Sequence, residues 1–142
     1  MTSILLPDGA TIEYLTPVED GSPCLMRGTI PAGGVVPLHS HADPETFIVL
    51  AGEAESYTDG NWATVAAGDV HHIPGNVRHG WRNGPEPAVM HLVTTATMAR
   101  FFREVAADPE EFLAISDRYG YWNATPEENA AIGLTIPAPA RP

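Results

Sequence analysis

The first two thirds of the chain read as a series of short strand-like segments separated by turn residues. Glycine and proline recur between the segments, and Asp59-Gly60 has the residue types of a two-residue hairpin turn. Because no helical pattern separates the segments, the series predicts an antiparallel sandwich or barrel. The predicted strands cover residues 11–15, 24–30, 35–39, 46–50, 53–58, 63–66, 70–73, 78–83 and 88–94.

A histidine pair in this region indicates a metal site. Side chains alternate between the two faces of an extended strand, so His39 and His41 point the same way and can bind one ion. Glu45 follows four residues later and His79 lies downstream. Imidazole and carboxylate groups suit divalent transition metals, and two histidines with one carboxylate leave positions open for oxygen chemistry.

The spacing around these residues forms two blocks. The first block contains Gly33, His39, His41, Glu45 and Gly52, and the second contains Gly68, Pro74, His79 and Asn83. Together they resemble the two sequence motifs of the cupin superfamily, and the first block matches at every signature position. The second departs once, with Gly75-Asn76 where the family usually carries its glycine one place later. Because asparagine tolerates positive φ better than most residues, we expect this turn to keep its shape.

The resemblance covers residues 33–83 and implies an all-β fold, an antiparallel jelly-roll barrel. Carried over position by position, it implies that His39, His41, Glu45 and His79 bind one divalent transition metal inside the barrel. Iron, manganese, nickel, copper and zinc all accept these ligands. Glu45 is either a ligand throughout or also a catalytic general base on a substrate hydroxyl, and we favour the ligand role.

Strand alternation predicts the walls of a substrate pocket. Phe47 and Val49 share the face of Glu45, and Trp81 and Asn83 share the face of His79. Such apolar lining suits a flat, oxygen-bearing molecule better than a sugar phosphate, which would require inward arginine or lysine. The alternative interpretation is that the apolar members are plain barrel core.

The remaining histidines and the cysteine have simpler interpretations. His71 and His72 are adjacent on a strand, so at most one of them points inward. We predict a structural role for His91, or a supporting role behind a metal ligand. Cys24 is predicted to be a small buried apolar residue.

Helical patterns replace the strands after about residue 97. Met98, Phe101 and Val105 belong to one apolar helical stripe. A second helix is predicted to start at Asp108 as N-cap and to stop at Gly120, and Thr125-Pro126-Glu127-Glu128 marks a third, which ends near Gly133. The predicted organisation is a barrel over residues 1–96, a short C-terminal α-helical extension over 97–133 and a flexible tail over 134–142.

Two interpretations of the extension are open. It packs against the outside of the barrel or a partner subunit, which we favour, or it forms a lid over the barrel mouth. The lid would contribute aromatic residues to the pocket, drawn from Phe101, Phe112, Tyr119, Tyr121 and Trp122. Exposed strand edges and an apolar helical face lead us to expect a homodimer.

Composition excludes several classes of function. The 142 residues fit one barrel domain, and 18 acidic against 7 basic residues give a net charge of −11, which argues against nucleic acid and anionic membranes as partners. All basic residues are arginine, so Schiff-base catalysis and a lysine-containing phosphate loop are excluded. One cysteine, no export signal and no membrane-spanning run lead us to expect a cytoplasmic protein.

The overall plan is similar to that of small bacterial cupins of the quercetin dioxygenase type, which carry a helical extension ending in a Tyr-Gly element such as Tyr119-Gly120. This resemblance implies a metal-dependent dioxygenase that acts on an enolic or phenolic small molecule. One alternative is a metal-dependent isomerase or cyclase that uses no oxygen. Another is a non-catalytic cupin that binds a small ligand.

Overall fold

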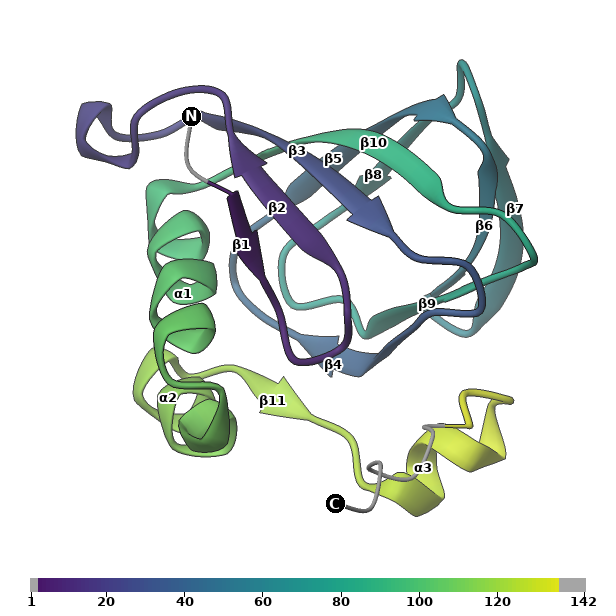
Figure 1. The fold of residues 1–142 in the computed structure, drawn as a ribbon. Helices are drawn as coiled ribbons and strands as arrows, with labels where there is room; N and C mark the ends of the chain where they lie inside the picture. The colour runs from purple at the N-terminus through teal and green to yellow at the C-terminus, as the bar shows by residue number, and fades with distance from the viewer. Residues whose placement is uncertain (1–2, 136–142) are drawn as a thin grey trace, which may run out of the picture.

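A computed structural model describes residues 3–135, which form two facing antiparallel sheets and a C-terminal helical extension (Figure 1). The six-stranded sheet has the order β1-β2-β3-β10-β5-β8, and the five-stranded sheet has the order β11-β4-β9-β6-β7. The predicted antiparallel barrel is therefore confirmed. The strands are β1 (Ser3–Leu5), β2 (Thr11–Tyr14), β3 (Cys24–Ile30), β4 (Val35–Ser40), β5 (Glu45–Ala51), β6 (Glu53–Thr58), β7 (Asn61–Ala66), β8 (Val70–Ile73), β9 (His79–Asn83), β10 (Ala88–Thr94) and β11 (Trp122–Asn123).

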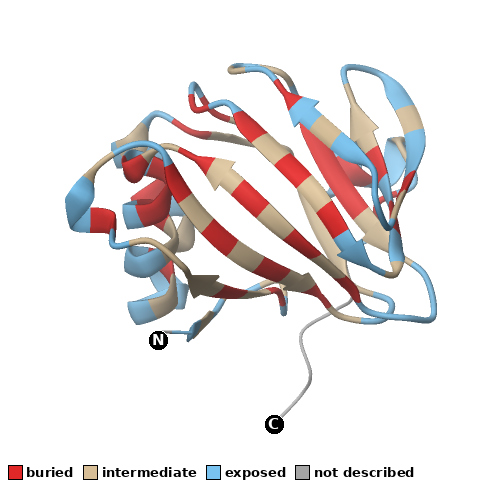
Figure 2. Cartoon of the chain, turned by 90° about the horizontal axis from the view of Figure 1, so that it is seen from above, coloured by how far each residue is buried: buried red, intermediate tan, exposed pale blue. Residues whose placement is uncertain are grey.

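Alternating burial along the strands builds the barrel core. In β3 and β10 every second residue is buried and the residues between them are half-buried, which is visible as alternating bands in Figure 2. The inward side chains include Met26, Val49, Trp81 and Leu92. Full burial of such a side chain contributes about 1.5–3 kcal/mol, so the alternating pattern fixes which face turns inward.

Two turns behave as their residue types predict. Asp59 and Gly60 have φ values of 49° and 86° and connect the paired residues Thr58 and Asn61, as a two-residue hairpin loop requires. Asn76 has a φ of 64°, so it adopts the left-handed conformation for which the family pattern uses glycine. Both predictions are confirmed.

The helical extension consists of α1 (Ala96–Ala107), α2 (Phe112–Tyr119) and α3 (Pro126–Ala131). Helix α1 is capped by Thr95, whose hydroxyl accepts the Met98 N–H at 3.0 Å. As predicted, α2 ends at Gly120, which has a φ of 74°. Helix α3 begins with a complete capping box formed by Thr125 and Glu128.

The start of the second helix differs from the prediction. Asp108 makes no side-chain capping bond, and a 3-10 helix, Pro109–Glu111, precedes α2. Proline fixes its own φ near the helical value, so Pro109 starts this tighter turn without the aspartate cap. A second short 3-10 helix, Val18–Asp20, lies before β3.

Two short strands, β1 and β11, were not predicted from the sequence. They contain three and two residues, too few for a recognisable alternation. Tertiary pairing creates them: Ile4 pairs with Ile12, and Asn123 pairs with His39. Strand β11 thereby joins the chain beyond α2 to the edge of the barrel.

The first part of the extension lies at one side of the barrel, where α1 stands beside β1 and β11 connects α2 to the edge strand β4 (Figure 1). Met98, Phe101, Val105, Ile115 and Tyr121 form a second, smaller apolar core there. None of the helices in the described residues is long and apolar enough to cross a membrane. Of the predicted tail, residues 136–142 lie outside the described part of the chain, and Leu134 is buried.

Candidate metal centre

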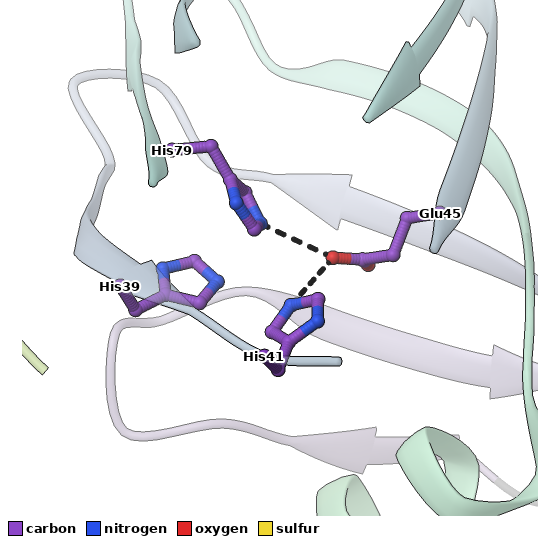
Figure 3. Close-up of side chains that lie close together, drawn as sticks. All are labelled: His39, His41, Glu45 and His79. Carbon is purple, nitrogen blue, oxygen red and sulfur yellow. Dashed lines mark hydrogen bonds and ion pairs between the residues drawn. The ribbon is translucent and has the colours of Figure 1, made fainter. Parts of the chain in front are cut away.

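The four predicted ligands converge at one end of the barrel. His39 lies on β4, His41 directly follows β4, Glu45 begins β5 and His79 begins β9. Because β4 and β9 belong to one sheet and β5 to the other, the site joins the two sheets. One ligand atom from each side chain lies within 4.8 Å of all the others, and Figure 3 shows the rings gathered around the Glu45 carboxylate.

Backbone carbonyls orient the three imidazoles. The Nδ1 atoms of His39, His41 and His79 lie 2.7, 2.8 and 2.8 Å from the carbonyl oxygens of Pro37, Asp43 and Val77. A carbonyl only accepts hydrogen bonds, so each Nδ1 carries a proton and donates. In a neutral ring this leaves the lone pair on Nε2, the nitrogen that metal-binding histidines commonly offer.

The contacts of Glu45 fit a cation between these donors. His41 Nε2 lies 2.8 Å and His79 Nε2 lies 3.2 Å from the same oxygen, Glu45 Oε1 (Figure 3). His41 Nε2 is fully buried and has no hydrogen-bond partner of acceptable geometry. Buried polar atoms are rarely left without a partner, so this orphaned nitrogen is accounted for by a metal ligand role. Three imidazoles and one carboxylate are a suitable donor set for a divalent transition metal.

Electrostatics favour a charged Glu45 and a neutral His39, but favour a proton on His41. Burial alone would raise the pKa of Glu45, but the contacts with His41 and His79 hold that pKa below its usual range. Burial, reinforced by the neighbouring histidines, lowers the pKa of His39 to about 3, so this ring is neutral near physiological pH. For His41, burial is outweighed by the Glu45 carboxylate, which raises the pKa.

Asp43 ties the ligand loop to the helical extension. Its carboxylate is buried and accepts hydrogen bonds from the hydroxyl groups of Thr95 and, at 2.7 Å, Tyr121. Burial and the bond to Asp43 raise the pKa of Tyr121, so its hydroxyl stays protonated. Sequence reasoning missed this role of Asp43, although a carboxylate between His41 and Glu45 was the available signal.

Gly75 and Asn76 support the same loop from the other side. The Asn76 N–H donates to the His41 carbonyl at 2.7 Å. A Cβ atom on Gly75 would lie only 2.3 Å from the carbonyl oxygen of Ala42. The second sequence block therefore positions His41 through backbone contacts as well as supplying His79.

Two cavities meet at the ligands. The inner cavity, of about 90 Å³, lies within the barrel and is lined by His39, Glu45 and His79 among apolar residues. The mouth cavity, of about 470 Å³, reaches His39 and His41 from the side of the helical extension. Its volume falls in the usual range for small-molecule sites. Access to the ligands thus passes between the barrel and the extension.

The predicted pocket residues separate into two groups. Phe47 and Trp81 line the inner cavity, with ring centroids 5.0 Å apart. Val49 is buried in the core and lines neither cavity. The side-chain amide of Asn83 donates to three backbone carbonyls and fixes a turn at the end of β9, so it also lines neither cavity. The role of Phe47 and Trp81 in contacting a substrate stays a prediction.

The arginines of the same strand region, Arg78 and Arg82, line neither of these two cavities. The Arg78 guanidinium lies 4.0 Å from the ring centroid of Trp122, and that of Arg82 lies 3.9 Å from the ring centroid of Trp62. Trp122 is therefore engaged with Arg78 and is absent from the cavity walls. Neither arginine is available to bind an anionic group beside the metal ligands.

The extension contributes aromatic residues to the mouth cavity, as the lid interpretation predicted. Phe101, Phe112 and Tyr121 line the mouth cavity. Tyr119 does not, since it packs on Phe101 and its hydroxyl bonds to the carboxylate of Glu104. Three of the five aromatic candidates thus face the space above the ligands.

The other histidines lie outside the ligand set. His71 points inward, where Nε2 lies 3.0 Å from the Ser56 hydroxyl and the ring packs against Trp81. His72 is exposed, which confirms that only one of the two adjacent residues points inward. His91 is half-buried on the opposite face of β10 from Met90 and Leu92, so it does not back a ligand. Cys24 is fully buried, as predicted.

Comparison with protein families and solved structures agrees with this architecture. Residues 26–94 match the model of the family described as Cupin domain, and this range contains all four ligands. Curated protein sequences gave no match.

Three solved structures illustrate the similarity in fold. A predicted oxalate decarboxylase from Thermotoga maritima has 24% identity and a TM-score of 0.55, over 61% of this chain and 79% of that chain. The polyketide cyclase RemF from Streptomyces resistomycificus has 24% identity and a TM-score of 0.57, over 61% of this chain and 65% of that chain. An RmlC-like cupin from Shewanella frigidimarina has 19% identity and a TM-score of 0.59, over 67% of this chain and 83% of that chain.

Proposed function

The chain carries a cupin domain, and from this premise we propose that it is a metal-dependent dioxygenase acting on an enolic or phenolic small molecule. The observation that carries the proposal is the combination of three imidazoles and one carboxylate with two cavities that meet at them. A divalent transition ion held by these donors supplies a Lewis acid with open positions, at which a substrate hydroxyl loses its proton more readily.

The residues of the chain divide the remaining tasks. His39, His41, Glu45 and His79 hold the ion, and their orientation is fixed before it binds because the three Nδ1 atoms are already engaged. Glu45 is enclosed between two imidazoles, which supports a ligand role over that of a mobile base.

The cavity walls support a flat and largely apolar substrate. Phe101, Phe112 and Tyr121 line the mouth cavity, and Phe47 and Trp81 line the inner one. No arginine or lysine belongs to the described lining of either cavity. A phosphorylated or strongly anionic substrate would lack a counter-charge there, whereas an aromatic enol with one ionisable hydroxyl would not need one.

Oxygen uptake tests the proposal directly. Protein loaded separately with iron, manganese, nickel, copper and zinc is mixed with a panel of flavonols and β-diketones. We expect at least one metal form to consume oxygen in step with the substrate, and His39→Ala to lose both bound metal and turnover. The absence of oxygen consumption from every combination would contradict the dioxygenase assignment.

The same panel separates the alternatives. Conversion of a substrate under strictly anaerobic conditions would identify a metal-dependent isomerase or cyclase. Tight binding of an enol without any conversion would identify a ligand-binding cupin.

A further inference from the structure

Asp8 occupies a fixed position in the turn between β1 and β2. The turn is closed by the Gly9 N–H, which donates to the Leu6 carbonyl at 3.0 Å, and by the Leu6 N–H, which donates to the Ala10 carbonyl at 2.9 Å. One carboxylate oxygen of Asp8, Oδ1, accepts the Ala10 N–H at 2.9 Å. The other oxygen, Oδ2, makes no hydrogen bond with the described residues. The turn thus orients the carboxyl group and leaves one oxygen for another partner.

The Asp8 side chain lies where the two cavities meet. Six residues line both the inner and the mouth cavity: Leu6, Asp8, Val36, His39, Met98 and Phe102. Within this set only Asp8 and the ligand His39 carry titratable side chains. Asp8 therefore borders the same two cavities as the ligand His39.

Each of the other titratable groups in the described cavity walls is either a proposed metal ligand or hydrogen-bonded to another side chain. Four of them are the proposed metal ligands, His39, His41, Glu45 and His79. The hydroxyl of Tyr121 donates to the Asp43 carboxylate at 2.7 Å. Asp8 is consequently the one proton acceptor in the described walls that is engaged neither as a ligand nor with another side chain.

We propose that Asp8 is the catalytic base of the site, accepting the proton of the substrate hydroxyl through Oδ2. This assignment rests on the proposed function. The substrate O–H bond breaks, its electron pair stays on the substrate oxygen that approaches the metal ligands, and a new O–H bond forms on Asp8. The proton returns to the product when it leaves, so Asp8 is regenerated and no additional reactant is needed.

The surroundings of Asp8 suit a group that holds a proton during turnover. Burial raises the pKa of its carboxyl group, opposed only by backbone hydrogen bonds. No arginine or lysine in the described walls of the two cavities competes for its charge. The turn itself does not require a carboxylate, because an asparagine would offer the same oxygen to the Ala10 N–H.

The substitution Asp8→Asn tests this proposal, because asparagine keeps the hydrogen bond from the Ala10 N–H and removes the proton acceptor. Asp69→Asn is the matched control, because Asp69 also accepts a backbone N–H, from Ala66 at 2.8 Å, but is exposed and lines neither cavity. Each protein is loaded with zinc and titrated with 3-hydroxyflavone at neutral pH. Calorimetry in buffers of different ionisation enthalpy counts the protons released, and absorbance shows whether the bound flavonol is an anion.

With wild type and Asp69→Asn we expect the bound flavonol to be an anion and fewer protons to reach the buffer per bound anion than with Asp8→Asn, because Asp8 accepts the substrate proton. With Asp8→Asn we expect the release of close to one proton per anion bound, with unchanged zinc content and melting temperature. In the metal form that turns over, kcat of Asp8→Asn should fall by about 100-fold or more. Asp8→Ser, whose hydroxyl can also accept the Ala10 N–H, provides a second variant if Asp8→Asn does not fold.

The contrary outcomes are distinct. Equal proton release by all three proteins, or a bound flavonol that stays neutral in wild type, overturns the role of Asp8 and leaves the dioxygenase proposal standing. Failure of zinc-loaded wild type to bind the flavonol overturns the assignment of Asp8 and the flavonol-type substrate together.

Discussion

The ligand end of the barrel and the wall of the mouth cavity are built in different ways. All four ligands lie within residues 26–94, the range that matches the family model, and their rings are held by backbone carbonyls nearby in the chain. The wall of the mouth cavity comes largely from outside that range, from the turn that carries Asp8 and from α1, α2 and Tyr121. The donor set thus lies within the range that matches the family model, whereas most of the residues that line the mouth cavity lie outside it.

This difference suggests where specificity resides. Local backbone contacts can preserve the geometry of an ion site while the surrounding segments change, because each ligand is positioned by its own strand end. The mouth cavity depends on side chains from segments far apart in the sequence, such as Leu6 and Phe112. We therefore expect substitutions at the ligand end to alter metal binding and substitutions in the mouth wall to alter substrate choice.

Loss of a ligand is the most severe way to break this comparison. In His79→Ala we expect metal affinity to fall by more than about 100-fold, since changes behind a ligand alone cost about 10- to 100-fold. His72→Ala is the control, because His72 is exposed and bonds to the Thr46 hydroxyl away from the site. Metal content and calorimetric titration check both, and metal retention by His79→Ala would contradict the four-ligand site.

Gly75→Ala tests whether the backbone positions the ligands. The added Cβ would lie 2.3 Å from the Ala42 carbonyl oxygen, next to His41. We expect the free energy of unfolding to fall by about 3 kcal/mol and metal affinity to fall with it. In Gly84→Ala the Cβ meets no atom within 4 Å and φ is not positive, so the change should stay within about 0.5 kcal/mol. Denaturant titration measures both free energies of unfolding, and equal stability of Gly75→Ala and Gly84→Ala would contradict the tight backbone contact at Gly75.

Tyr121→Phe tests the connection between the two regions. The variant removes the 2.7 Å hydrogen bond to buried Asp43 and leaves a carboxylate oxygen without that donor. We expect a loss of about 1–3 kcal/mol in stability and about a 10-fold loss in metal affinity, because the loop between His41 and Glu45 is then less constrained.

Tyr119→Phe is the control for that prediction. The Tyr119 hydroxyl bonds to Glu104, whose side chain is exposed, so its removal should cost no more than about 0.5 kcal/mol. Equal metal affinity of Tyr121→Phe and wild type would mean that the extension does not support the ligand loop.

The sequence predicted the ligand end well because its signals are local. The strand bearing His39, the turn at Gly75-Asn76 and the positive φ of Asn76 each depend on a few consecutive residues. The hairpin at Asp59-Gly60 and the capping box at Thr125 follow for the same reason.

The mouth wall was predicted less well because long-range contacts create it. Nothing near Asp8 in the sequence shows that its turn lines the two cavities, since Pro-Asp-Gly is an ordinary turn signal. Strand β11 exists only because Asn123 pairs with His39. Asn83, which the strand pattern assigned to the pocket, instead satisfies backbone carbonyls at a strand end. Periodicity gives the face of a residue but not the group that it meets.

The smallest expected effect comes from two buried serines, one in each region. Ser56 is 0% exposed in the barrel and its hydroxyl bonds to Thr58 and His71, whereas Ser116 is 1% exposed in α2 and its hydroxyl has no hydrogen-bond partner in the described structure. An unpaired buried hydroxyl costs about 1–3 kcal/mol, and alanine is also the better helix former.

We therefore expect Ser116→Ala to raise the free energy of unfolding by about 1 kcal/mol. We expect Ser56→Ala to lower it by about 1 kcal/mol, because the substitution removes the hydroxyl that bonds to both Thr58 and His71 and leaves His71 Nε2 only the longer contact of 3.2 Å with Thr58. Opposite shifts in melting temperature, of about 4 °C each, would be measured by calorimetry. Destabilisation by both substitutions would indicate that the hydroxyl of Ser116 is satisfied in solution. The mouth wall would then be as fully hydrogen-bonded as the barrel, and this distinction between the two regions would be lost.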